Sequence, residues 1–188
     1  QMDKATQHYQ LAVQLAPSDT EVQIAFAHFR WAQGVAQPFE PIIQAITDPL
    51  NQTELYLACI DLLLNAEQFE LLSEILSLGY SVLRNNPLFN MFAARYARLS
   101  GDLDAAERYI NAAVKYSKRP VPVSIENERG YIALARQNSK LGLSIYRTLQ
   151  QREPDNQGWW TLHSTALKLA DMSTEYAALC DYSLVHCS

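Results

Sequence analysis

The chain has 188 residues, of which 48% are hydrophobic and 19% are charged, with six glycines and eight prolines. This composition is that of an ordered protein with enough apolar surface to form a core. It contains no run of about 18 apolar residues, so we expect no membrane span and no membrane partner.

The net charge of -5 is unevenly distributed. Residues 1–80 contain 2 Lys or Arg against 10 Asp or Glu, whereas residues 81–188 contain 13 against 10. An acidic first half argues against general nucleic-acid binding, which requires a continuous basic face. The more basic second half is suited to attract an acidic peptide or domain.

The cysteines and the first residues bear on the compartment of the protein and on whether the chain is a fragment. Cys59, Cys180 and Cys187 are too few and too scattered for a disulfide framework, so we expect a reducing cytoplasm. The start of the chain has neither the apolar core nor the cleavage site of a signal peptide. Because it begins without Met and inside a predicted helix, we expect a fragment of a longer protein.

Helical spacing of apolar residues recurs along the whole chain, and no alternation typical of strands is present. Proline, glycine and polar turns separate the helical segments. Ser18 or Asp19 is expected to cap the second helix, and Thr53 the fourth. The predicted helices span residues 3–16, 19–33, 38–47, 53–65, 68–84, 88–100, 103–117, 122–137, 139–152, 157–170 and 174–186.

Turns recur at a nearly constant interval. The predicted turns near Gly34, Asn65, Gly101, Asn138 and Asp171 are 31 to 37 residues apart. Such spacing is typical of stacked helical hairpins, which bury their apolar faces against one another. We therefore predict one all-α domain over residues 1–188, an α-α superhelix of about eleven antiparallel helices. Its approximate repeats are a half repeat at 1–17, then 19–48, 53–86, 87–117, 122–154 and 157–187.

One pattern of small and bulky residues recurs within these helices. Ala5–Pro17 and Gly142–Pro154 each contain a small residue, a Tyr four residues later and a closing proline after the same interval. This pattern resembles the tetratricopeptide repeat (TPR), and Trp160 matches the Trp of that repeat's first helix. His163 stands where the family usually has Leu. The resemblance implies a scaffold that binds proteins. Gly130 and Gly142 cost about 1 kcal/mol each inside a helix, and close helix packing is the expected reason.

A second resemblance involves the end of the chain. The residues Trp160, Leu162, Ala166 and Leu169, followed by Asp181-Tyr182 and Val185, are similar to the junction of bacterial proteins that join such repeats to a 2-oxoglutarate/Fe(II) oxygenase domain. The resemblance implies an iron site beyond residue 188. Repeat-linked sulfotransferases are an alternative parent.

Catalytic and metal-binding patterns are absent from the sequence. His8, His28, His163 and His186 fall in different predicted repeats, so they form no pairing suited to a non-haem iron site. The adjacent His186 and Cys187 are a weak metal signal, and no phosphate loop, nucleophile elbow or zinc pattern is present. We predict no catalytic residue, cofactor or metal in this chain.

The TPR resemblance implies that the first helix of each pair lines an inner wall. On this wall we expect the mixture of aromatic and arginine side chains that binding hot spots prefer. The candidates are His28, Trp31, Tyr56, Met91, Arg95, Arg98, Asn127, Tyr131, Thr165 and Lys168.

Arg95 and Arg98 are three residues apart on one helix face, so both can reach one acidic ligand. The alternative is that they are solvated surface arginines, and Tyr56 and Tyr131 equally fit packing between helices. Two functions remain open. The chain is either a module that binds a protein or peptide, or a structural arm that docks the catalytic domain of a larger enzyme or forms a dimer. Exposed terminal helices are the expected contact of a homodimer.

Overall fold

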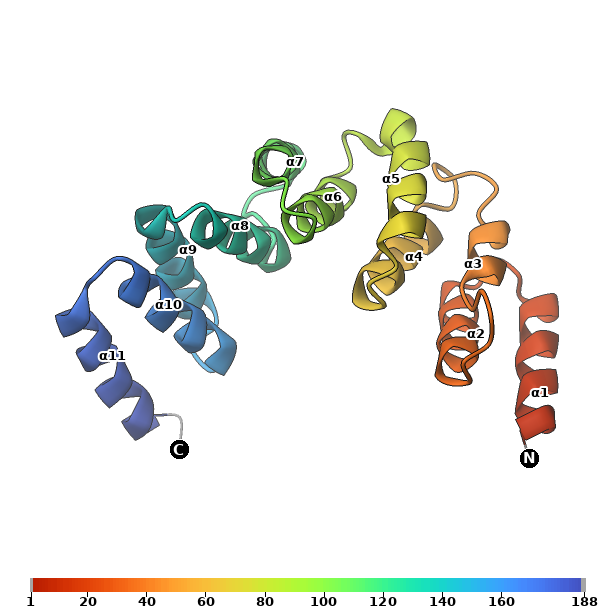
Figure 1. Cartoon of the computed structure of the whole chain (residues 1–188), viewed down its shortest axis with the longest axis horizontal. Helices are drawn as coiled ribbons and strands as arrows, with labels where there is room; N and C mark the ends of the chain where they lie inside the picture. Colours follow the sequence, from red (N-terminus) through yellow and green to blue (C-terminus); the bar gives the residue numbers. More distant parts are fainter. Residues whose placement is uncertain (1, 187–188) are drawn as a thin grey trace. The chain divides into compact units, whose positions relative to one another are not determined.

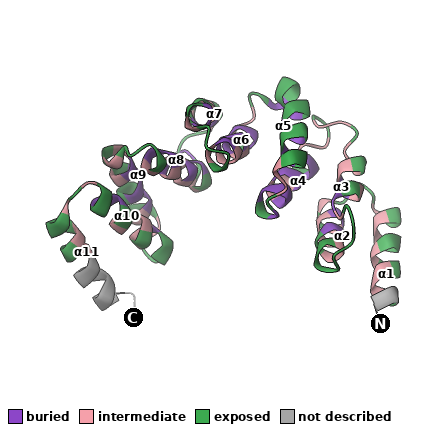
Figure 2. Cartoon of the chain, viewed as in Figure 1, coloured by how far each residue is buried: buried purple, intermediate pink, exposed green. Residues whose placement is uncertain are grey.

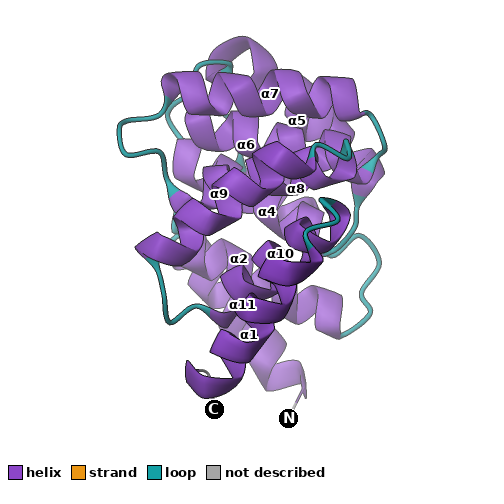
Figure 3. Ribbon diagram, turned by 90° about the vertical axis from the view of Figure 1, so that its left-hand side faces the viewer, coloured by secondary structure: helices purple, strands orange, loops and turns teal. Residues whose placement is uncertain are grey.

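The computed structural model describes the backbone of residues 2–186 and side chains within residues 4–179. Over that range the chain forms eleven α-helices and no strand (Figure 3). The predicted all-α class is therefore confirmed, and the predicted helix ends differ from the observed ones by at most two residues. The helices are α1 (Met2–Leu15), α2 (Thr20–Ala32), α3 (Glu40–Ala45), α4 (Thr53–Asn65), α5 (Phe69–Leu83), α6 (Pro87–Leu99), α7 (Leu103–Tyr116), α8 (Val123–Ala135), α9 (Ser139–Arg152), α10 (Gln157–Leu169) and α11 (Ser173–His186).

The helices belong to two compact units, Gln1–Arg84 (unit 1) and Asn85–Ser188 (unit 2). In unit 1, α2 packs against α1, α3 and α4, and α4 packs against α5. Seven of the thirteen residues of α4 are buried, and Figure 2 shows much of this helix in purple. The prediction of a single repeat domain over residues 1–188 stays a prediction.

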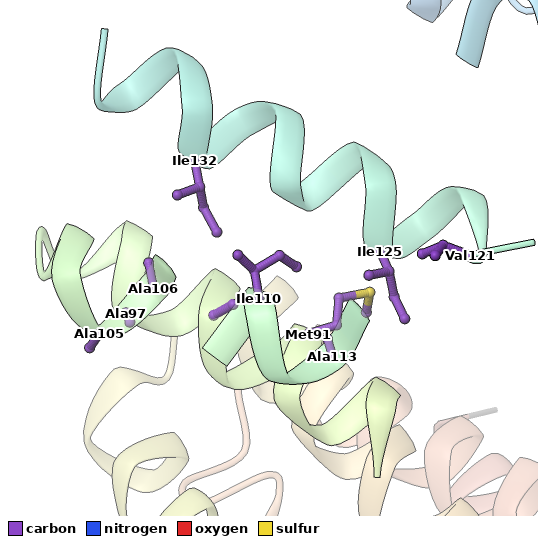
Figure 4. Packing of buried hydrophobic residues seen from close by; sticks show 10 residues of the cluster. Met91, Ala97, Ala105, Ala106, Ile110, Ala113, Val121, Ile125 and Ile132 are labelled. Atoms are coloured by element: carbon purple, nitrogen blue, oxygen red, sulfur yellow. The ribbon is translucent and has the colours of Figure 1, made fainter. Parts of the chain in front are cut away.

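Unit 2 consists of three helical hairpins, α6–α7, α8–α9 and α10–α11, and each hairpin packs against the next (Figure 1). Small residues on the first hairpin, such as Ala94 and Ala106, are fully buried and allow the helices to approach closely. Ile110 of α7 belongs to the same cluster as the buried Ile125 and Ile132 of α8, and its side chain points toward α8 (Figure 4). Each fully buried isoleucine contributes about 1.5–3 kcal/mol, so this cluster joins the first two hairpins firmly.

Residues with left-handed backbone mark the turn inside successive hairpins. Gly34, Glu67, Gly101, Gln137 and Asp171 all have φ between 55° and 84°, and they are 33 to 36 residues apart. After each one, the next amide donates a hydrogen bond of 2.8–3.1 Å to the carbonyl five residues earlier. This is the Schellman motif, which satisfies the free carbonyls of a helix end. The turns expected at Asn65 and Asn138 are thus centred on Glu67 and Gln137.

Helix starts follow the predicted capping chemistry in part. Asp19 caps α2, since its Oδ1 accepts a hydrogen bond of 3.0 Å from the Val22 amide. Thr53 does not cap α4, which corrects the prediction. It is already the first helical residue, and its hydroxyl donates to the Leu50 carbonyl at 2.7 Å. The preceding Gln52 instead accepts from the Asp48 amide at 2.9 Å and closes the loop before α4.

The glycines inside helices mark close contacts, as expected. A Cβ at residue 130 would lie 2.5 Å from Cζ of Tyr146, and one at residue 142 would lie 2.7 Å from Cδ2 of Leu134. Gly79 of α5 makes the same kind of room for Tyr56 of α4, at 2.5 Å from the phenol oxygen. An alanine at any of these positions would force the neighbouring side chain to shift, and the cost is greatest at Gly79 and Gly130, where that neighbour is a buried tyrosine ring.

Candidate functional site

The first helices of the three hairpins of unit 2 are α6, α8 and α10. Two of them, α6 and α8, bring together the predicted Arg98 and Tyr131 and a third side chain, Glu128. Nε and Nη2 of Arg98 on α6 lie 2.6 and 3.3 Å from the two carboxylate oxygens of Glu128 on α8. The guanidinium carbon of Arg98 lies 5.0 Å from the centre of the Tyr131 ring, one turn further along α8. We call these three residues the Arg98 cluster. It joins α6 to α8 through a two-point ion pair and a cation–π contact.

Glu128 is the member of this cluster that sequence reasoning missed. It is only 6% exposed, and a buried carboxylate requires a cationic partner. The Arg98 side chain is 19% exposed, so it is not a solvated surface arginine, which corrects that alternative. A signal was present, because Glu128 lies three residues after Ile125 and four before Ile132, on the helix face that is buried.

Asn127 and Tyr131 extend the surface around the Arg98 cluster. Tyr131 is half-buried and meets the ring of Tyr146 edge-on at 6.5 Å. The Oδ1 atom of Asn127 is buried and has no hydrogen-bond partner within the part of the chain that the structure describes. Burial raises the pKa of Tyr146, so its hydroxyl stays protonated and donates toward the Asn127 carbonyl at 3.5 Å.

The remaining candidates of unit 2 have different environments. Arg95 is half-buried and has an interaction of its own. Thr165 is exposed, and its hydroxyl donates to the Thr161 carbonyl at 2.9 Å. Lys168 is exposed, with its ammonium 4.6 Å from the Tyr176 ring centre. Met91 is 8% exposed and belongs to the hydrophobic core, which corrects its placement on a surface wall.

The candidates of unit 1 divide in the same way. His28 and Trp31 are exposed neighbours on α2, with ring centres 6.3 Å apart, and Trp31 also contacts Phe39. Tyr56 is 1% exposed, and its hydroxyl donates to the Ile75 carbonyl. Burial raises the pKa of Tyr56 to about 12. Tyr56 is therefore a packing residue, as the alternative interpretation held.

The described side chains include one buried thiol and no cluster of metal-ligating groups. No group of three or more His, Cys, Asp or Glu among them is placed to hold a metal ion. Cys59 is fully buried, and burial raises the pKa of its thiol to about 12, which keeps the thiol unreactive. Cys180, His186 and Cys187 lie outside the described side chains. None of the described helices is both long and apolar enough to span a bilayer.

Comparison with known proteins supports the fold. No family model and no curated protein sequence matches this chain. Among solved structures, the chain is similar to one in the APC/C hetero-tetramer Cut9–Hcn1, with a TM-score of 0.70 and 13% identity. That likeness covers 98% of this chain and 36% of the other, so this chain spans about a third of its length.

A second similar structure is TTC0263, a thermophilic TPR protein of Thermus thermophilus. Here the TM-score is 0.63 and the identity 16%, covering 88% of this chain and 90% of the other. Identities this low establish the fold alone. The chain therefore has the all-α, TPR-like fold that its sequence resembles.

Proposed function

We propose that this chain is a protein-interaction module that binds a segment of a partner protein along the first helices of unit 2. The observation that carries the proposal is the Arg98 cluster, in which a half-buried aromatic ring and a fixed guanidinium meet between α6 and α8. Residues of these two kinds dominate the binding energy of most protein interfaces. Arg95, Asn127, Thr165 and Lys168 complete the proposed surface.

The rigidity of the Arg98 cluster favours binding. A free arginine side chain loses about 0.5–1.5 kcal/mol of conformational freedom when a partner immobilises it. Glu128 and Tyr131 already hold Arg98 in place, so most of this loss has been met during folding.

The charge of the surface suggests a moderately acidic partner. Arg98 is compensated by Glu128, so its charge adds little to the attraction of an acidic ligand. Residues 81–188 hold 13 Lys or Arg against 10 Asp or Glu, and this positive balance supports an acidic partner. We therefore assign a shape-defining role to Arg98.

The solved structures support protein binding in general. Cut9–Hcn1 is a complex of two different proteins, and one of its chains shares this fold.

The test is a peptide selection against the purified chain, followed by affinity measurements on substituted proteins. We expect Tyr131→Ala to weaken binding of a selected peptide at least about tenfold, as for a hot-spot residue. Tyr116→Ala, which removes an exposed tyrosine of α7, is the matched control and should leave binding unchanged. Equal effects of the two substitutions would contradict binding of the peptide along the first helices of unit 2.

A second candidate function is a docking arm of a larger enzyme, either a 2-oxoglutarate/Fe(II) oxygenase or a sulfotransferase. It is favoured by the resemblance of the last helices to a repeat–oxygenase junction. The likeness to about a third of a longer chain shows that this fold occurs within larger proteins. The coding sequence after residue 188 tests this candidate: it predicts a continuing catalytic domain, and a stop codon there would eliminate it.

A further inference from the structure

A pocket of about 540 Å³ opens between α9, α10 and α11 of unit 2. Its size falls within the range of about 300–1,000 Å³ that is usual for ligand pockets. Apolar side chains, among them Trp160, Leu167 and Leu179, form most of the wall. Arg147 and Glu175 contribute one charge of each sign, so the pocket has no net charge.

His163 of α10 lines this pocket and is only 6% exposed. Its Nδ1 lies 2.6 Å from Oε1 of Gln150, an oxygen that only accepts hydrogen bonds. The ring proton is therefore on Nδ1, and Nε2 carries a lone pair. Nε2 is buried and has no hydrogen-bond partner among the described residues.

The protonation state of His163 supports this assignment. Burial lowers its pKa, and the neighbouring positive charge of Arg147 lowers it further. The imidazole is thus neutral at pH 7, and Nε2 is an acceptor. A buried acceptor without a partner costs free energy, so a ligand that supplies a donor here recovers that cost.

We propose that the pocket lined by His163 binds a tyrosine side chain of a partner protein. The phenol donates its hydrogen bond to Nε2 of His163 once the side chains that cover this buried atom move aside, and the ring packs against Trp160 and Leu167. A charged side chain fits poorly, because the apolar wall cannot replace the water that a charge loses on burial. A phenylalanine would fill the apolar part but leave Nε2 unpaired.

The chain itself uses the same arrangement twice. Tyr56 and Tyr146 are both buried, and the hydroxyl of each donates toward a carbonyl oxygen, that of Ile75 and that of Asn127 respectively. A tyrosine that places its ring among apolar side chains and its hydroxyl on a buried acceptor is therefore compatible with the packing of this fold.

This inference is independent of the first-helix surface. The pocket is built from the second helices α9 and α11 as well as from α10, and it shares no residue with the Arg98 cluster. It depends only on the chain being a protein-binding module. Loss of binding at one surface therefore leaves the other open to test.

The experiment uses three small probes: N-acetyl-tyrosinamide, its O-methyl ether and N-acetyl-phenylalaninamide. The chain is labelled with ¹⁵N at its histidines, and both affinity and the imidazole resonances are followed by NMR at pH 7. We expect the tyrosine probe to bind about tenfold more tightly than the other two, because only its hydroxyl can donate. The Nε2 resonance of His163 should shift with the tyrosine probe alone.

The wild-type series is decisive without any substitution. Equal affinities for the three probes, an unshifted His163 resonance, or no binding at millimolar concentration would each overturn the proposal. A His163→Leu variant, checked for folding by circular dichroism, should bind all three probes equally. The control is His8→Leu, which replaces an exposed histidine of α1 and should keep the wild-type preference.

Discussion

Arg98 and Glu128 form a two-point ion pair between α6 and α8, and the carboxylate is nearly buried. The pair connects consecutive hairpins of unit 2 at the position where the proposed binding surface begins. It thus acts both on the stability of the unit and on the shape of that surface.

Removing one partner of this pair should destabilise the protein strongly. Arg98→Met leaves the Glu128 carboxylate buried without a counter-charge, and we expect a loss of about 3–5 kcal/mol in the free energy of unfolding. The double substitution Arg98→Met with Glu128→Leu removes both charges and should recover most of this loss. Urea unfolding measures both variants. A double variant as unstable as Arg98→Met would show that burial of the carboxylate is not the cause.

Gly130 is predicted to be intolerant of even one added methyl group. A Cβ there would lie 2.5 Å from Cζ of Tyr146, so Gly130→Ala must displace a fully buried ring. We expect a loss of about 1–3 kcal/mol, as for other overpacked cores. Adding Tyr146→Leu should relieve the clash, so the second change should cost less in the Gly130→Ala protein than in the wild type. Additive effects of the two substitutions on thermal unfolding would refute the clash.

The left-handed turn residues offer a stabilising substitution. Glu67 and Gln137 have φ of 55° and 58°, a conformation that costs a non-glycine residue roughly 1–2 kcal/mol. Glu67→Gly and Gln137→Gly should therefore raise the melting temperature slightly. Gly101→Ala, at φ 84° with no atom near the added Cβ, should lower it by strain alone. Unchanged melting temperatures in all three variants would speak against the Schellman geometry.

Acidification should destabilise unit 2 through His163. Its pKa in the folded protein lies below the ordinary value of 6.5, because burial and then Arg147 disfavour the charged form. Below pH 6.5 the unfolded chain binds a proton that the folded chain does not, so stability falls as the pH is lowered toward the folded pKa. Arg147 and Glu175 are the charged groups that share the pocket with it.

The measurement compares unfolding free energies of the wild type and His163→Leu from pH 7 to pH 5. We expect the wild type to lose more stability over this interval than the variant. If the two slopes coincide, His163 does not carry the effect.

Periodicity allowed the helices to be predicted closely, because each buries one face and ends at a proline, glycine or polar turn. The turn centres were less accurate. Glu67 and Gln137 adopt left-handed backbone despite having no intrinsic preference for it, since the hairpin geometry imposes the conformation. Gly34, Gly101 and Asp171, whose residue types do favour turns, were located correctly.

The candidate site was predicted less completely than the fold. Arg98, Asn127 and Tyr131 lie at or beside one cluster, but the burial of Glu128 that organises it depends on contact with a residue 30 positions away. Tyr56 and Met91 were assigned to a surface by repeat register, yet both are buried. Their neighbours Gly79 and Ala94 are small, so these larger side chains fill the space between helices. Sequence spacing shows which face a residue occupies, but not how deeply its neighbours cover it.

Two exposed leucines on α1 allow a test of the homodimer hypothesis. Leu11 and Leu15 are 50% and 77% exposed and lie one turn apart on α1. If they form a dimer contact, light scattering should show a dimer that dissociates on Leu11→Glu with Leu15→Glu. A wild-type chain that is monomeric at high concentration would contradict this hypothesis.

The central claim, that a partner binds along the first helices of unit 2, is tested most directly by NMR mapping. The amide resonances of the ¹⁵N-labelled chain are followed while a selected peptide is added. The account predicts that the largest changes fall on α6, α8 and α10, centred on Arg98, Asn127 and Tyr131. Changes confined to α7 and to the outer residues of α9 would contradict it.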